Sequence, residues 1–436
     1  MENITQNELP LDIKKYLNKF ASDKWKTFST KKRSYKTVIV IPAIAEYENI
    51  KHLIASLLQN NDEYLAETLI LFVINNNKTS SAKIKVDNMK TTEYLSEIII
   101  KHPKLNLDFI DAFSPATALD NKDGGVGLAR KIGMDYALRL FNYNSPRKNI
   151  IICLDADCTV EQNYIKTIRQ YFDNYNIDAG YVNFKHPLSE NKEEQYAIIN
   201  YEIFLRYYVL GLKYARSPFA YHSIGSTMVC SSSGYIKVQG MNKRKAAEDF
   251  YFMEKLSKIT EIKKIDGTAV LPSGRGSWRV PFGTGQRVNR FLGKTQNEYL
   301  LYSPSSFVVL KNWLTLFHSQ KTLSADQYLT EAKRISVSLL QFLIKNNFEK
   351  NWKKIIENSS SEKQIKKQKQ FWFDGFKTLK LIHYLRDTEF PSINMFNALD
   401  EIFALMDISF EYRNKMNQIP PLAIQKKYLE KLREIA

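Results

Sequence analysis

Cysteine and histidine are scarce in this sequence. Its 436 residues include 3 cysteines and 6 histidines. Cys153, Cys158 and Cys230 form no CxxC pair, which argues against a zinc site or a redox motif. An odd and sparse set of cysteines is typical of a reducing compartment. Among the histidines only His222, in AYHSIGSTMVC, lies in a context that suggests a functional role, and a core or loop histidine is the alternative.

Sequence patterns typical of a signal peptide or an uninterrupted membrane span are also scarce. The N-terminus, MENITQNELP, does not show the basic and then apolar pattern of a signal peptide. The best candidate for a membrane span, AIINYEIFLRYYVLGLKYA, is interrupted by Asn200, Glu202 and Arg206, and it therefore predicts a buried amphipathic helix. We expect a cytoplasmic protein that touches a membrane at most peripherally.

The composition that is present indicates a soluble, well-packed protein. Hydrophobic residues make up 44%, charged residues 25% and aromatic residues 13% of the chain. Its length is more typical of two domains than of one. The formal net charge of +17 suits nucleic acid, anionic lipid or phosphorylated small molecules as partners. A generally lysine-rich surface without such a partner is an equal alternative.

Strands and helices alternate between about residues 37 and 290. Buried-type strands such as TVIVIPA, TLILFVINNN and NIIICLDAD are separated by helical patterns such as EYENIKHLIASLLQN. This alternation predicts an α/β fold with a mostly parallel sheet covered on both faces. We expect an N-terminal helical leader over 1–36, the α/β domain over 37–294 and a helical C-terminal domain over 295–436.

Acidic and amide side chains follow the predicted strands, where ligands bind in such sheets. Asp155 and Asp157 lie two positions apart in IICLDADCTV, so in extended backbone they point to the same side. Mg²⁺ and Mn²⁺ are commonly held by one or two carboxylates together with substrate phosphates. The alternative is a pair of surface acids in which Asp157 or Thr159 caps the next helix.

A second acid pair opens the segment AEDFYFMEKL. Glu248 and Asp249 stand at the start of a predicted helix, where acids are favoured by the helix dipole alone. The functional interpretation is a general base directed at a hydroxyl group.

Two glycine-rich segments carry arginines. In SGRGSWRVPFGTGQR, Arg275, Arg279 and Arg287 are candidates for a pyrophosphate clamp, and solvated arginines in a structural loop are the alternative. DGGVGLARKIG fails as a dinucleotide fingerprint, because Arg130 stands where a third small residue is required and no strand precedes it. It predicts a flexible loop and helix start that brings Arg130 or Lys131 near an anion.

Taken in order, these motifs resemble the inverting glycosyltransferases of family two, which have the GT-A fold. The resemblance covers roughly residues 37–290. It rests on a first strand followed by Glu46, a second ending in Asn75 and Asn76, and then, in this order, GGVGLARKIGMD, LDAD, GSTMVCSSSGYIKVQGM and AEDF.

The resemblance implies a role for each matched residue. Asp249 would be the catalytic base, and Asp157, with Asp155, would hold Mn²⁺ or Mg²⁺ on the diphosphate. The donor nucleotide would be bound by Pro42, Glu46, Asn75, Asn76, Arg130, Asp155, Arg275 and Arg279, and Glu248 and His222 would lie on the acceptor side. The implied donor is a UDP- or GDP-sugar, and the acceptor is a glycan, a lipid-linked molecule or a small molecule, with no nucleic acid as partner.

Departures from the family pattern leave alternatives open. Ile44-Ala45 replaces the usual Tyr-Asn, and Asn75 stands where many members have Asp. The Gln-x-x-Arg-Trp motif of processive synthases is absent, which favours transfer of a single sugar. The alternatives are a retaining GT-A enzyme acting on a small phosphorylated acceptor, a nucleotidylyltransferase, and a basic nucleic-acid-binding protein. The last leaves LDAD and AEDF unexplained, because acids repel phosphate.

Overall fold

The computed structural model of the chain describes residues 9–29, 34–60, 62–102, 105–276, 283–415 and 417–436. The chain forms two compact units: unit 1 comprises 1–187 and 223–273, and unit 2 comprises 188–222 and 274–436. The expected division at residues 36 and 294 stays a prediction. Across these described residues, no helix has the length and apolar character that a membrane span requires.

Unit 1 is built on an eight-stranded sheet, counted over the described residues, with the order β3-β2-β1-β4-β7-β6-β8-β5. The strands are β1 (Thr37–Ala43), β2 (Thr68–Asn75), β3 (Leu107–Ala112), β4 (Ile150–Cys153), β5 (Thr159–Val160), β6 (Ala179–Phe184), β7 (Met228–Ser231) and β8 (Lys263–Leu271). β3, β2, β1 and β4 run parallel to their neighbours, β6 and β8 are parallel, and β7 and β5 are antiparallel to the strands beside them. The predicted α/β class with a mostly parallel sheet is confirmed.

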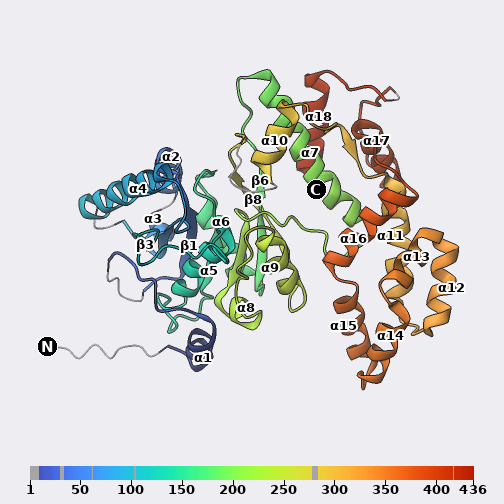
Figure 1. Cartoon of the computed structure of the whole chain (residues 1–436), viewed down its shortest axis with the longest axis horizontal. Helices are drawn as coiled ribbons and strands as arrows, with labels where there is room; N and C mark the ends of the chain where they lie inside the picture. The colour runs from blue at the N-terminus through green and yellow to red at the C-terminus, as the bar shows by residue number, and fades with distance from the viewer. Residues whose placement is uncertain (1–8, 30–33, 61, 103–104, 277–282, 416) are drawn as a thin grey trace. The chain divides into compact units, whose positions relative to one another are not determined.

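Helices cover both faces of this sheet (Figure 1). They are α1 (Leu11–Phe20), α2 (Tyr47–Leu58), α3 (Asp62–Ala66), α4 (Ala82–Lys101), α5 (Val126–Ala137), α6 (Tyr164–Asn174), α8 (Ser232–Lys237) and α9 (Glu248–Ser257). Side chains of α2, α4 and α6 share one core with Ile39 and Ile41 of β1. Because side chains alternate along a strand, Val40 points to the other face, where α5 packs so closely that a Cβ at Gly133 would overlap it.

The N-terminal segment belongs to unit 1 and holds one helix in its described part. In α1, Tyr16 is buried and its hydroxyl donates to Asp135 of α5 at 2.8 Å. Further along, Phe28 donates its backbone N–H to the Phe109 carbonyl in β3 at 2.8 Å. In its described part, the expected helical leader is therefore a ten-residue helix followed by non-helical chain that bonds the edge strand β3 at Phe28.

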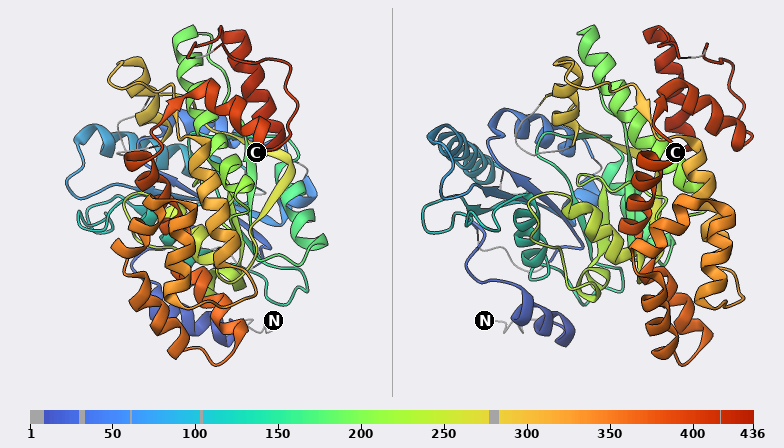
Figure 2. Two further views of the ribbon diagram at one scale, coloured as in Figure 1. Left: turned by 90° about the vertical axis from the view of Figure 1, so that its right-hand side faces the viewer. Right: turned by 45° about the vertical axis from the view of Figure 1, so that its right-hand side comes forward.

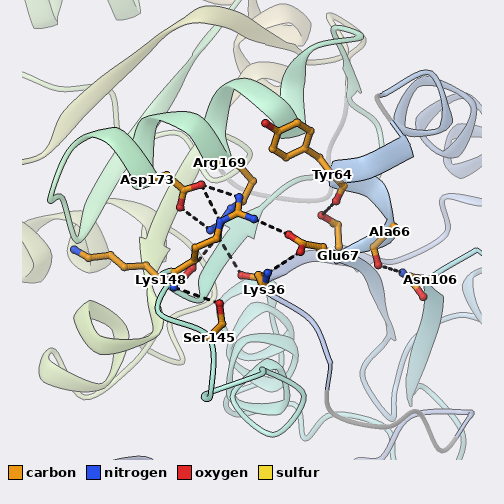
Figure 3. A network of polar contacts seen from close by, with 11 residues as sticks. Lys36, Tyr64, Ala66, Glu67, Asn106, Ser145, Lys148, Arg169 and Asp173 are labelled. Carbon is orange, nitrogen blue, oxygen red and sulfur yellow. Dashed lines mark hydrogen bonds and ion pairs between the residues drawn. The ribbon is translucent and has the colours of Figure 1, made fainter.

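A polar network closes the amino ends of the strands (Figure 3). Arg169 of α6 is buried and donates to the backbone carbonyls of Lys36 at 3.3 Å and Lys148 at 2.8 Å, just before β1 and β4. It also bonds Asp173 at 2.9 Å, and Arg147 links Asp173 to Glu67. With this edge closed by protein groups, the opposite, carboxyl-end edge carries the polar side chains of the candidate site.

Unit 2 is helical (Figure 2). Its helices are α7 (Lys192–Tyr214), α10 (Thr284–Leu292), α11 (Pro304–Phe317), α12 (Ala325–Ile335), α13 (Val337–Lys345), α14 (Phe348–Glu357), α15 (Glu362–Trp372), α16 (Gly375–Thr388), α17 (Met395–Leu405) and α18 (Leu422–Ile435), with short antiparallel strands β9 (Leu300–Leu301) and β10 (Ile393–Asn394). The predicted helical C-terminal region is confirmed. The predicted buried helix over 197–215 is α7, whose Glu202 is fully buried and bonds Arg206 of α7 and Arg433 of α18.

Candidate active site

The residues expected at the carboxyl edge of the sheet come together in unit 1. β1 and β2 are parallel and in register through Ala43 and Ile74, so their following residues emerge at the same edge. Pro42 itself is buried inside β1. Its missing N–H costs no ladder bond toward β4, because the pairing of β1 with β4 stops at Val40. Glu46 is buried at the N-cap position of α2, in the turn that follows β1.

The acid pair lies in a turn and not in extended backbone. β4 ends at Cys153, and the backbone N–H of Cys158 bonds the carbonyl of Asp155 at 3.2 Å. The same-side argument from strand alternation is therefore wrong for Asp155 and Asp157. The capping alternative is also wrong, because α6 begins at Tyr164 with Asn163 in the N-cap position. Both acids remain partly exposed.

Arg130 supplies the positive charge beside these acids. Its guanidinium pairs with Asp155 through one terminal nitrogen and with Glu248 through the other. Burial alone would lower the pKa of Arg130, but the carboxylates of Asp155 and Glu248 outweigh burial and raise that pKa, so the residue stays cationic. A Cβ at Gly225 would overlap the guanidinium, so Arg130 is held against backbone on that side.

The glycines of DGGVGLARK bring α5 against the loop that carries the second acid pair. A Cβ at Gly127 would overlap the carbonyl oxygen of Arg244, and a Cβ at Gly125 would lie 2.8 Å from the Cα of Lys245. The side-chain amide of Asn242 donates to the carbonyl of Glu248 at 2.8 Å. The glycines therefore allow the close approach that places Glu248 on Arg130, a role that the motif alone did not reveal.

Glu248 and Asp249 have different surroundings although they are adjacent. Glu248 is 3% exposed and paired with Arg130, whereas Asp249 is partly exposed and accepts a hydrogen bond from the backbone N–H of Phe250 at 2.7 Å. Although part of the Asp249 residue is exposed, protein atoms surround its carboxyl group, and this burial together with the charge of Glu248 raises the pKa of Asp249 to about 7. A carboxylate with this pKa is suited to take a proton near neutral pH.

The predicted donor residues Asn75 and Asn76 have structural hydrogen bonds. The Asn75 amide donates to the carbonyls of Ala43 at 3.0 Å and Val73 at 3.1 Å. The Asn76 amide donates to backbone carbonyls, and its oxygen accepts from Asn88 at 3.0 Å. Because both side-chain N–H groups of Asn75 already donate hydrogen bonds, a ligand contact with this side chain would use its amide oxygen, Oδ1.

Asn88 of α4 was missed by sequence reasoning. It is 1% exposed, donates to the Asn75 carbonyl at 3.0 Å and accepts from the backbone N–H of Ala45 at 2.9 Å. Ala45 has a φ of 52°, a left-handed conformation that needs local support. The only signal in the sequence was a polar residue on the buried side of α4, three residues before the buried Thr91.

The remaining predicted site residues lie in unit 2 or outside the described residues. His222 is buried and Arg275 is exposed, both in unit 2, and their expected roles stay predictions. Arg279 lies outside the described residues. Arg287 bonds Glu298 at 3.0 Å, and its guanidinium stacks on Phe204 at 4.2 Å. These contacts favour the structural interpretation of Arg287 over a pyrophosphate clamp.

A metal would find two carboxylates here. Among the described residues, no group of three or more His, Cys, Asp or Glu side chains is placed to hold a metal ion. Burial raises the pKa of the Cys153 thiol to about 12, so it stays protonated and is a poor ligand. If Asp155 and Asp157 hold a divalent ion, as the sequence predicts, its remaining ligands must come from substrate phosphates and water.

Comparisons with known proteins give similarity at the level of solved structures. Neither the protein-family models nor the sequences of curated proteins match this chain. The crystal structure of S. aureus TarS 1-349 in complex with UDP-GlcNAc has a TM-score of 0.40 and 12% identity, covering 77% of this chain and 90% of that one. The mannosyltransferase PcManGT from Pyrobaculum calidifontis, in complex with GDP-Man and Mn²⁺, has a TM-score of 0.38 and 11% identity, covering 86% and 93%. Because the TM-scores and sequence identities are this low, no ligand of these proteins is assigned to this chain from the similarity alone.

Proposed function

We propose that this protein is a glycosyltransferase that moves one sugar from a nucleotide-sugar donor to an acceptor hydroxyl with inversion. The observation that carries the proposal is Asp249, a carboxyl with a pKa of about 7 in a cluster with Arg130, Glu248 and Asp155 at the carboxyl edge of the sheet. Attack by a hydroxyl on a sugar carbon needs a group that takes the proton as the bond forms.

The two acid pairs have different proposed roles, metal binding for Asp155 and Asp157 and proton transfer for Asp249. Asp157 and Asp155 would hold Mn²⁺ or Mg²⁺, which neutralises the charge that develops on the leaving nucleoside diphosphate. The Glu248 carboxylate is engaged in an ion pair with Arg130, so we assign the role of base to its neighbour and not to Glu248. Asp249 keeps a raised pKa although the charge of Arg130 lowers it, and it would accept the proton of the acceptor hydroxyl.

A nucleic-acid-binding function fits this site poorly. Asp155, Glu248 and Asp249 share one arginine, so the site keeps an excess of acid. A phosphate backbone would be repelled unless a divalent ion or further cations came with it. A small diphosphate delivered together with a metal ion meets that requirement.

The metal role of Asp157 is tested by calorimetry. UDP and GDP are titrated into the protein with and without Mn²⁺. The nucleotide-sugar that carries the base of the tighter-binding diphosphate, UDP-GlcNAc or GDP-mannose, is then titrated in the same way. We expect tight binding only with Mn²⁺, and the Mn²⁺ dependence should disappear in Asp157→Ala. The matched control is Asp266→Ala, an acid on β8 whose side chain is 65% exposed. Equal affinity with and without the ion would remove the metal from the proposal.

A further inference from the structure

A strongly basic hairpin forms one end of unit 2. It comprises the end of α13, α14, α15 and the turn between them, residues 344–370, and is called the basic hairpin below. These 27 residues contain eight lysines and three glutamates, so they carry five of the seventeen net positive charges of the chain. Figures 1 and 2 show α14 and α15 together at the end of unit 2 that lies away from α17 and α18.

The lysines of the basic hairpin face solvent. Seven of the eight are exposed: Lys345, Lys350, Lys353, Lys354, Lys363, Lys366 and Lys367. Within the part of the chain that the structure describes, only Lys353 of these seven forms an ion pair, with Glu357 at 3.9 Å. Neighbouring acids therefore compensate little of this positive charge, and the basic hairpin offers a solvent-exposed cationic surface.

Apolar side chains are exposed in the same segment. Ile344 is 59% exposed at the end of α13, and Ile356 is 39% exposed near the end of α14. Neither packs into the core below, which is formed instead by Phe348, Trp352 and Ile355 of α14. Aliphatic side chains next to lysines match a membrane surface, where the lysines meet lipid phosphates and the aliphatic groups enter the boundary region.

The basic hairpin is held rigidly from inside. The Lys369 ammonium is buried, donates to the Tyr328 hydroxyl at 3.0 Å and lies 5.5 to 5.7 Å from the ring centres of Phe317, Tyr328 and Trp352. This cation–π arrangement fixes α15 against α11, α12 and α14. The exposed lysines of α14 and α15 therefore lie on helices that are anchored to the core of unit 2.

We propose that the basic hairpin docks on an anionic lipid bilayer. Nucleic acid fits the same surface less well, because the hairpin contains no arginine and its Phe348 and Trp352 rings are buried. Recognition of nucleic acid commonly uses arginine forks and exposed aromatic rings for stacking. Lysines with exposed isoleucines provide the charge and the apolar contact that bilayer adsorption needs.

The test is co-sedimentation of the full-length protein with phosphatidylcholine vesicles that contain or lack phosphatidylglycerol. We expect binding only to the anionic vesicles. Changing Lys353, Lys354, Lys366 and Lys367 to Gln should weaken it at least about tenfold, because each lysine near an anionic surface is worth about 1 kcal/mol, a factor of roughly five. The double variant Ile344→Ser and Ile356→Ser should weaken binding to anionic vesicles at high salt, where the apolar contribution remains after the charges are screened.

Helix α4 offers a matched control. It also has four exposed lysines, at 83, 85, 90 and 101, and exposed Val86, Met89 and Ile100, but three acids leave it nearly neutral. Four Lys→Gln changes there should leave vesicle binding unaltered. The proposal is overturned if the wild type ignores anionic vesicles, if both fourfold variants lose binding equally, or if the hairpin variant loses only binding to soluble polyphosphate.

Discussion

At the scale of single residues, two adjacent acids differ because of one arginine that is distant in sequence. Glu248 pairs with Arg130, 118 residues away, and Asp249 keeps a raised pKa beside them. The sequence identified all three residues as site candidates, because acids and arginines stood near predicted strand and helix ends. The sequence did not reveal which of the two acids forms the ion pair with Arg130, because that pairing depends on the packing of α5 against the loop before α9.

The raised pKa of Asp249 predicts a pH-dependent difference in stability between the wild type and Asp249→Asn. Its folded-state pKa is about 7, whereas an unfolded Asp titrates near about 4. Between these values the folded protein holds a proton that the unfolded chain has released, so the free energy of unfolding falls as the pH rises. Asn at this position does not titrate, and Asp249→Asn should therefore be increasingly more stable than the wild type as the pH rises from about 5 to about 8.

The measurement is the melting temperature of both proteins across that pH range. Asp266→Asn serves as the control, because the side chain of Asp266 is 65% exposed and should give a small and constant difference. A constant difference between Asp249→Asn and the wild type would contradict the raised pKa of Asp249.

At the scale of elements, α5 and its glycines organise the site. A helix start was predicted in DGGVGLARKIG, and in the structure the helix runs from Val126 to Ala137. Helical periodicity indicated the helix, but no local pattern indicates that its first turn contacts residues 242–248. Close approach between segments far apart in sequence depends on the whole fold. In the sequence, only the clustered glycines of DGGVGLARKIG hinted at this close approach.

Gly127→Ala tests this close approach through the sign of its effect. Within a helix this change usually stabilises by about 0.4–1 kcal/mol. Here a Cβ would overlap the carbonyl oxygen of Arg244, and backbone has little room to move. We therefore expect a destabilisation of about 1–3 kcal/mol and weaker catalysis, measured by urea unfolding and donor turnover.

Gly293→Ala is the matched control for this change. Gly293 has a φ of −76°, and a Cβ there would lie 3.1 Å from the carbonyl oxygen of Asn289, a tight contact but a less severe one than at Gly127. The free energy of unfolding should therefore change less for Gly293→Ala than for Gly127→Ala. An increase in stability for Gly127→Ala would mean that α5 and the loop before α9 are not in contact.

At the scale of the whole molecule, the two units are not consecutive in sequence. The periodicity of residues 197–215 predicted a buried helix correctly, but it carries no information on which core the helix enters. In the structure Ile199, Ile203 and Tyr207 of α7 belong to the core of unit 2, together with side chains of α11, α17 and α18. The partners of an amphipathic helix are fixed by long-range packing.

Truncation at residue 294 is predicted to fail for this reason. It would remove α11 to α18, exposing the apolar face of α7 and leaving the buried Glu202 without Arg433. We expect such a chain to aggregate or to bind the dye ANS strongly, as proteins with exposed apolar surface do. A soluble monomer with a cooperative melting transition would show that α7 does not depend on the C-terminal helices.

The most direct test of the central claim is the rate of nucleoside diphosphate release from a bound nucleotide-sugar, compared between the wild type and Asp249→Asn. Water takes the place of the acceptor, so the acceptor need not be known. We expect Asp249→Asn to bind the donor normally and to release diphosphate about 10² to 10⁴ times more slowly. Release at the wild-type rate would contradict Asp249 as the base and the inverting mechanism, and would leave retaining transfer as the better explanation of the site.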